Sequence, residues 1–345
     1  MKTRTVIRML LWASVATLLA MSGKAHADPG SYTGTEGHTT LDKFQVTGWG
    51  GVFHTSLTDG VWSRYGYIQE QAHEWQDVVS IASARDGADD LHLLATTRDG
   101  RLLHVLGDDQ GWSGFGTVAG YNGGAADPGP HPGLEIGTTA AAIDENGDLE
   151  VLATVAGGHH VVHTTRYARA LDWEQLHSIN DEVGWRGAVR KIGLARSAAR
   201  MNMFAVTDDG NVYYSYRNLG ERTWAPFYNI KWQCGEPGPV TDVSAVASGD
   251  AVHFMAIASG RLWHCGATPD AWSDFVEVPL PSGVSPASVD LTTDHPGLRA
   301  TITGADGTVH DAVSTGQVFG AIWSPFAKVL NDAAPGPFVD VSAVG

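Results

Sequence analysis

The stretch TTRDGRLLHVLGDDQGWSGF (96–115) combines a tight turn, an alternating strand and an aromatic box within twenty residues. Asp99-Gly100 is a turn dipeptide that tolerates the positive φ of a two-residue β-hairpin. The strand after it ends at His104, and an acidic turn leads to Trp112-Ser113-x-Phe115. We expect a hairpin followed by an outer strand. His104 and Trp112 are either structural parts of this unit or components of a ligand site.

The same unit recurs six times along the chain. Its aromatic box begins at Trp62, Trp112, Trp173, Trp224, Trp272 and Trp323. The strand before each box is expected to end at His54, His104, His163, Tyr214, His264 and His310. A turn precedes that strand, and an apolar strand precedes the turn. Four strands in a repeat of roughly 50 residues are typical of a β-propeller blade.

The end of the chain predicts how the ring closes. Residues 340–345, DVSAVG, repeat the strand DVSAVA that opens the fifth copy at 242–247, whereas the first copy lacks such a strand. The sequence therefore predicts an all-β, six-bladed propeller closed by pairing of the C-terminal strand with the N-terminal blade. The expected blades span approximately residues 43–70 plus 339–345, 77–120, 137–180, 188–230, 241–280 and 285–330.

The first 27 residues have the pattern of a secretory signal peptide. Lys2, Arg4 and Arg8 precede an apolar run, and Ala25-His26-Ala27 matches a small-x-small cleavage site. We expect cleavage there, secretion to the extracellular space, and a loose leader over residues 28–42. Without the signal the chain keeps 18 Lys and Arg against 38 Asp and Glu. That charge disfavours nucleic acid and anionic membrane surfaces as partners, and no membrane insertion is expected.

The two cysteines, Cys234 and Cys265, lie 31 residues apart. In an exported chain the first interpretation is a disulfide between them. The alternative is a reactive thiol at Cys265, assisted by the neighbouring His264.

The repeat resembles the tectonin-like and sialidase-like repeats of bacterial propeller lectins, including the fucose-binding propeller lectins. The residues that carry this resemblance are the pattern L-x-L-x-A-x-x-x-D-G-x-L-x-H followed by W-S-x-F. It implies sugar sites in clefts between blades, built from the box Trp and the residue that ends the third strand. The candidate residues it implies are His54, Trp62, His104, Trp112, Tyr214, Trp224, His264, Trp272, His310 and Trp323. The third copy departs from the pattern at Glu174 and Leu176, and the fourth has Tyr214 in place of His.

The structural interpretation of the box Trp residues is packing between adjacent blades, which regular recurrence favours. Trp75, Trp185 and Trp232 fall outside the repeat, in the expected connections between blades. They either plug their loops or form aromatic platforms for sugar rings or a protein partner. The longest connection contains Tyr121, Asn122 and His131.

No motif of an enzyme active site is present, and no cofactor is expected. His159-His160-x-x-His163 alternates faces in a strand and is not expected to bind metal. The leading hypothesis is a secreted, non-catalytic lectin whose partners are glycans on a cell surface or an extracellular polymer. The alternatives are a protein-interaction or targeting subunit of a secreted, toxin-type assembly and, third, a divergent glycosidase.

Overall fold

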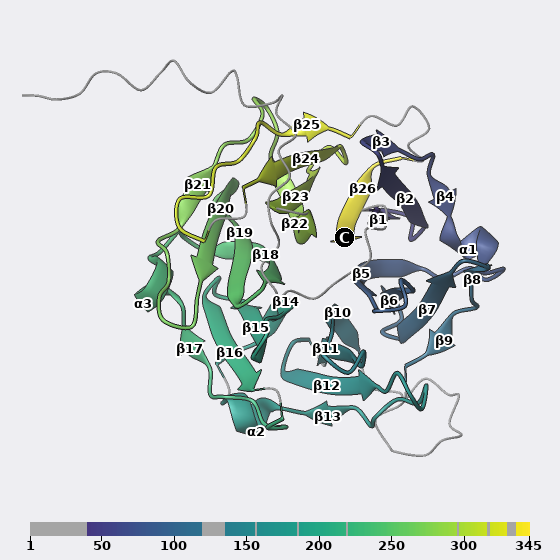
Figure 1. Ribbon diagram of the computed structural model, residues 1–345, viewed down its shortest axis with the longest axis horizontal. Coiled ribbons are helices and arrows are strands. Elements are labelled where there is room, and N and C mark those ends of the chain that lie inside the picture. Colours follow the sequence, from purple (N-terminus) through teal and green to yellow (C-terminus); the bar gives the residue numbers. More distant parts are fainter. Residues whose placement is uncertain are drawn as a thin grey trace, which may run out of the picture. The chain divides into compact units, whose positions relative to one another are not determined.

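A computed structural model describes residues 40–118, 135–155, 157–184, 186–218, 220–294, 297–315, 318–329 and 336–345. Six antiparallel sheets surround a central axis, as the sequence predicts (Figure 1). The expected signal peptide, most of the leader, and Tyr121, Asn122, His131 and Trp185 lie outside the described residues. Among the described residues, no helix is long and apolar enough to cross a membrane.

Each blade consists of three long strands and a short outer segment. Blade 1 contains β26 (Phe338–Val344), β1 (Leu41–Thr47), β2 (Val52–Thr58), β3 (Val61–Trp62) and β4 (Gly66–Tyr67). Blade 2 contains β5 (Val78–Arg85), β6 (Leu91–Thr97), β7 (Leu102–Asp108), β8 (Gly111–Trp112) and β9 (Gly116–Thr117). Blade 3 contains β10 (Ile136–Ile143), β11 (Leu149–Val155), β12 (His160–Arg166) and β13 (His177–Ser178).

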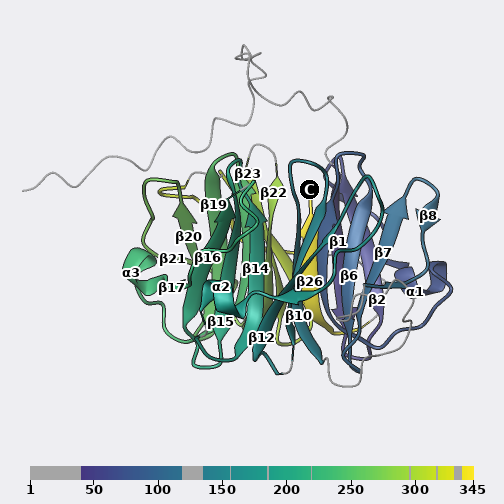
Figure 2. The ribbon, with the colours of Figure 1, turned by 90° about the horizontal axis from the view of Figure 1, so that it is seen from below.

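The second half of the ring follows the same order. Blade 4 contains β14 (Val189–Arg196), β15 (Arg200–Thr207), β16 (Val212–Asn218) and β17 (Tyr228–Asn229). Blade 5 contains β18 (Val240–Ser248), β19 (Ala251–Ala258), β20 (Arg261–Ala267) and β21 (Val276–Val278). Blade 6 contains β22 (Pro286–Asp294), β23 (Gly297–Gly304), β24 (Val309–Ser314) and β25 (Ala327–Lys328). Single-turn helices α1 (Ile68–Gln71), α2 (Asn180–Val183) and α3 (Lys231–Cys234) lie at the rim (Figures 1 and 2).

The ring closes through β26, which pairs antiparallel with β1 from Asp42–Val344 to Thr47–Phe338. The last strand of the chain is therefore the innermost strand of the first blade. β1 begins at Leu41, so the first blade starts two residues earlier than expected, inside the segment predicted as leader.

The hairpin turns also bond neighbouring blades together. The carbonyl of Gly210 accepts the N–H of Val240, the first residue of the next blade, at 2.9 Å. The same bond occurs at four other turns: Gly50 to Val78, Gly100 to Ile136, Gly158 to Val189 and Gly307 to Phe338. At the boundary between blades 5 and 6 this bond is absent, because the inner strand of blade 6 begins with Pro286, which has no N–H to donate. We call the ring face that carries these turns the connector face.

The innermost strands of all six blades line a central cavity of about 440 Å³. Buried carboxylates connect these strands across blade boundaries. Asp340 of blade 1 accepts the N–H of Ile81 at 3.1 Å, and Asp242 of blade 5 accepts the N–H of Val289 at 2.9 Å. On the inner strand of blade 6, Asp290 accepts the N–H of Ala343 of blade 1, and burial raises the pKa of Asp290 to about 7. The cavity wall therefore serves to hold the blades in a ring.

Candidate functional site

In blades 2 to 6, the box Trp packs against the preceding blade. Its indole meets the ring on the third strand of that blade edge to face, with centroids 5.1 to 6.0 Å apart. The five ring pairs are Trp112 with His54, Trp173 with His104, Trp224 with His163, Trp272 with Tyr214 and Trp323 with His264. These contacts define five equivalent blade junctions, and the sixth lies between blades 6 and 1. The recurrence of Trp thus has a packing reason in five of the six copies.

The Ser of the box has a structural role as well. Ser113 Oγ accepts the N–H of Leu106 at 2.9 Å, and Ser324 Oγ accepts the N–H of Val313 at 3.0 Å. Both bonds extend the ladder between the third strand and the outer segment. The Trp-Ser dipeptide therefore fixes the outer edge of a blade against its own sheet and the preceding blade.

The third-strand residues are mostly enclosed. The exposed fractions of His104, His163, Tyr214 and His264 are 9%, 2%, 6% and 3%. These four side chains face the blade junctions and have no free surface for a ligand. The strands also continue past these positions, so the expectation that they end there is wrong.

His310 does not occupy the equivalent position in blade 6. His104 stands four residues after the turn glycine Gly100, and four residues after Gly307 stands Asp311. Because successive strand residues point to opposite faces, a shift of one residue moves His310 off the junction. Asp311 instead accepts a bond from Lys43 of blade 1 at 2.6 Å, and the Lys43 ammonium lies 4.1 Å from the Trp62 ring centroid.

Each third-strand residue has a polar partner on the second strand of its own blade, which the repeat pattern did not single out. His92 Nδ1 lies 3.0 Å from His104 Nε2, and His253 Nδ1 lies 3.1 Å from His264 Nε2. In blades 1 to 6, the second-strand partner of the junction residue is Asp42, His92, Glu150, Asn202, His253 and Arg299, respectively. The sequence signal was a polar residue at the second or third position of an otherwise apolar strand.

Burial controls the protonation of several of these groups. It lowers the pKa of His104 and of His264 to about 3, and that of His253 to about 4. It also raises the pKa of Tyr214 to about 12. At the junction between blades 6 and 1, burial lowers the pKa of Lys43 to about 8, opposed by the charge of Asp311. These junctions hold neutral rings or closed ion pairs.

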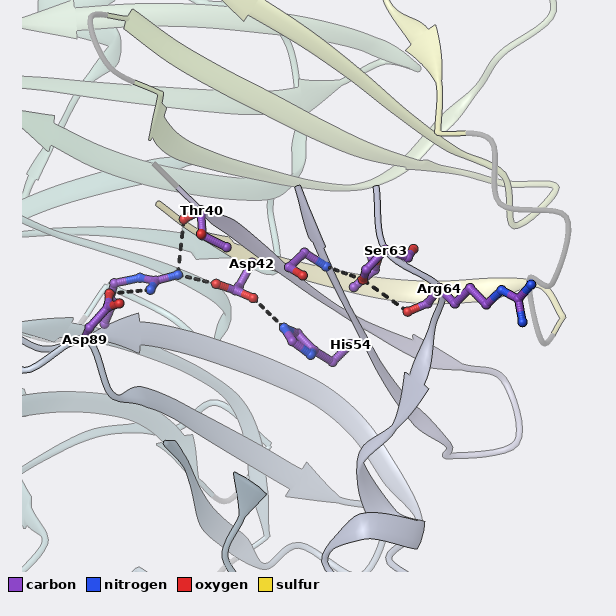
Figure 3. A network of polar contacts seen from close by, with 9 residues as sticks. Thr40, Asp42, His54, Ser63, Arg64 and Asp89 are labelled. Atoms are coloured by element: carbon purple, nitrogen blue, oxygen red, sulfur yellow. Dashed lines mark hydrogen bonds and ion pairs between the residues drawn. The ribbon is translucent and has the colours of Figure 1, made fainter. Parts of the chain in front are cut away.

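The junction between blades 1 and 2 differs, because its third-strand residue reaches solvent. The side chain of His54 is 22% exposed, and its Nε2 lies 2.5 Å from Asp42 Oδ1. Arg85 of blade 2 binds the other oxygen of Asp42, and it also donates to the backbone carbonyl of Thr40 at 3.2 Å and to Asp89 at 2.5 Å (Figure 3). We call Asp42, His54, Arg85, Asp89 and Trp112 the 1/2 junction site. A carboxylate, a guanidinium and an imidazole meet there beside a half-buried indole.

The junction between blades 3 and 4 has a similar donor set in a closed form. Arg217 donates to Glu150 at 2.8 Å, and His163 also contacts Glu150. Burial alone would raise the pKa of Glu150, but the bond from His163 and the nearby positive charges hold this pKa below its ordinary value. Both His163 and Glu150 are 2% exposed, so the charges satisfy one another inside the protein.

Two of the three expected platform residues are exposed. Trp75 is 55% exposed and Trp232 is 80% exposed, and both lie in connections between blades. Trp49, in the first hairpin turn, is 46% exposed, and the repeat pattern did not single it out because it lies inside a copy.

The predicted disulfide between Cys234 and Cys265 is confirmed. It connects α3, which carries Trp232, to β20 of blade 5. Among the described residues, no three His, Cys, Asp or Glu side chains gather as metal ligands.

Comparisons with known proteins place the fold. No protein-family model matches the sequence, and no curated protein matches it. The SapL1 lectin in complex with α-methyl fucoside superposes with a TM-score of 0.59 at 12% identity, over 86% of this chain and 94% of that one. The BP39L lectin from Burkholderia pseudomallei has a TM-score of 0.58 at 18% identity, over 85% and 81% of the two chains.

A third structure, described as a fungal lectin with a six-bladed β-propeller fold and a novel fucose recognition mode for Aleuria aurantia lectin, has a TM-score of 0.58. It is 11% identical, over 86% of this chain and 92% of that one. These likenesses bear out the propeller-lectin part of the expected resemblance as a likeness of fold. The chain therefore shares the six-bladed propeller fold of these lectins.

Proposed function

We propose that the protein is a non-catalytic glycan-binding protein and that the 1/2 junction site is its ligand site. The observation that carries this proposal is the open network of Asp42, His54 and Arg85 beside Trp112. Sugar hydroxyls both donate and accept hydrogen bonds. In this network, hydrogen-bond donors and acceptors lie side by side, since Asp42 is bonded to both His54 and Arg85. The indole supplies an apolar surface for the C–H face of a sugar ring.

The roles within the site follow from burial. The side chains of His54, Arg85 and Asp89 are 22%, 14% and 81% exposed, so they are able to meet a ligand. Asp42 is only 5% exposed and lies behind them, bonded to both His54 and Arg85. We assign it the role of orienting those two side chains. The fold likeness to fucose-binding lectins supports the ligand class and makes a fucoside the first probe.

The test is a glycan array followed by calorimetry with methyl α-fucoside and any array hit. We expect His54→Ala and Trp112→Ala each to weaken binding by at least about tenfold, which corresponds to about 1.4 kcal/mol. Tyr214→Phe is the matched control, because it removes only a hydroxyl bonded to Asn202 inside another junction.

An intact protein that binds no glycan would refute the proposal. If the wild type, His54→Ala and Trp112→Ala bind the glycan with equal affinity, the 1/2 junction site is not the ligand site. Turnover of fluorogenic glycosides would favour the glycosidase alternative instead.

A further inference from the structure

Two indoles are stacked in the open on the connector face of blade 1. Trp49 lies in the turn between β1 and β2, and Trp75 lies in the connection to blade 2. Their ring centroids are 5.6 Å apart and their planes differ by 10°. Both rings are about half exposed, at 46% and 55%. Exposed indole surface is unfavourable in water, so a clustered pair indicates a binding surface.

The fold does not require a Trp in this turn. The equivalent turn positions in the other blades are Asp99, Gly157, Asp209, Ser259 and Asp306. These smaller residues complete the same hairpin. Trp49 is therefore an addition specific to blade 1.

The pair is held in place before any ligand arrives. Trp49 packs edge to face on Phe53 at 5.8 Å and on Tyr67 at 5.9 Å. A Cβ at Gly51 would overlap the Trp49 indole, so the ring lies directly on the backbone there. The turn itself is fixed by Thr47 Oγ1, which accepts the N–H of Gly51 at 2.9 Å. A pre-oriented ring loses little conformational freedom on binding.

The size and charge of the patch select the class of ligand. Half of each of two indoles amounts to roughly 200 Å², whereas a stable protein interface needs about 800 Å² on each side. The same connection carries the exposed acids Glu70 and Glu74, which repel anionic polymers. The patch therefore fits a neutral ligand of two or three sugar units with a flat C–H face.

We propose that Trp49 and Trp75 form a second carbohydrate site, which stacks on neutral, β-linked, gluco-configured chains such as a β-1,4-glucan. The proposal rests on the glycan-binding function above and extends it to a different ligand. The two sites are separate, because Asp42 lies at the start of β1 and Trp49 follows its end. A seven-residue strand places these ends about 20 Å apart.

The test is titration of the full chain with cellopentaose, followed by calorimetry and by tryptophan fluorescence. We expect Trp49→Ala and Trp75→Ala each to weaken cellopentaose binding at least tenfold, and Trp75→Phe to retain part of it. Trp232→Ala is the matched control, since it removes an exposed indole at another connection. His54→Ala should also leave cellopentaose affinity unchanged. Thermal unfolding of each variant shows whether the propeller is intact.

Three results would overturn the proposal. The first is no cellopentaose binding by the wild type, and the second is equal affinity of the wild type and the Trp49→Ala, Trp75→Ala double variant. The third is a dimer in sedimentation that Trp75→Ala dissociates, which would assign the patch to a second copy of the chain. If cellopentaose does not bind but His54→Ala still weakens fucoside binding, the 1/2 junction site stands and only this second site is refuted. If glycan binding is lost only in Trp49→Ala and Trp75→Ala, the 1/2 junction site is refuted and the Trp49–Trp75 site stands.

Discussion

At the scale of single residues, the blade junctions are built from side chains that usually face solvent. His253 and His264 stack with centroids 5.3 Å apart, and Trp323 meets His264 edge to face. Such rings fit between sheets only while they are neutral, because a buried imidazolium has no water to solvate its charge. The stability of the propeller is thereby coupled to pH.

We predict that the free energy of unfolding falls as pH decreases from 6.5 toward 3. The folded-state pKa of His264, about 3, lies below the ordinary value of 6.5. Its stabilisation is therefore fully present above pH 6.5 and is lost progressively as the pH falls toward 3. His264→Gln should reduce the slope by up to about 1.4 kcal/mol per pH unit over that range. Denaturant unfolding at a series of pH values measures this slope.

Tyr214 provides the control. Burial raises its pKa to about 12, so Tyr214→Phe removes no group that titrates between pH 3 and 6.5 and should leave the slope unchanged. A wild-type slope that persists in full in His264→Gln would contradict the assignment to this residue.

At the scale of elements, the turns between second and third strands do two jobs. Gly210 has φ +77, which few residues other than glycine adopt, and its carbonyl bonds the next blade. A Cβ there would meet Pro239 Cα at 2.7 Å and Val240 N at 3.0 Å. Gly260 has a similar φ of +72, but a Cβ there would meet nothing within 4 Å. The chain thus offers a matched pair that separates backbone strain from blade contact.

We predict that Gly210→Ala destabilises the protein more than Gly260→Ala. Both variants carry the strain of a left-handed alanine, about 1 kcal/mol. Gly210→Ala additionally displaces the inner strand of blade 5, an overpacking cost of about 1–3 kcal/mol. Denaturant unfolding of the two variants compares them directly. Equal losses of stability would show that contact between turn and blade contributes little.

At the scale of the whole molecule, the ring is closed by ten residues from the far end of the chain. β26 supplies the inner strand of blade 1, and Asp340 bonds it to blade 2 through Ile81 and to blade 6 through Ser288. Without this strand, β1 would expose an unpaired edge toward the central cavity, and blade 1 would lose the bonds that Asp340 makes to both neighbours.

We predict that deletion of residues 336–345 abolishes the single cooperative unfolding transition. The matched control is a permutant in which residues 336–345 precede Thr40 through a short Gly–Ser linker. It should fold, because β26 ends beside the start of β1, with Val344 opposite Asp42. Circular dichroism and size-exclusion chromatography compare the two proteins. A deletion variant that stays monomeric with an unchanged melting curve would show that closure is dispensable.

Much of the fold follows from local pattern. The Asp-Gly turns, the alternating strands and the Trp-Ser box each depend on fewer than about twenty neighbouring residues, and their repetition predicts six blades. The repeated DVSAV segment predicts closure, and two cysteines in one copy predict the bond between Cys234 and Cys265. Of the residues in the proposed 1/2 junction site, the sequence offered His54 and Trp112 as candidates, whereas the repeat pattern did not single out Asp42 and Arg85.

What the sequence by itself determined is the number, order and internal pairing of the blades, since turn geometry and side-chain alternation are local properties of the chain. Only the tertiary structure decided which copy of a repeated residue is open. His54, His163 and His264 belong to the same pattern, yet only the neighbouring blade determines whether each ring is enclosed. Trp49 and Trp75 likewise become one surface through a turn and a connection that meet in space. Burial depends on contacts between distant segments, which a repeating local pattern does not encode.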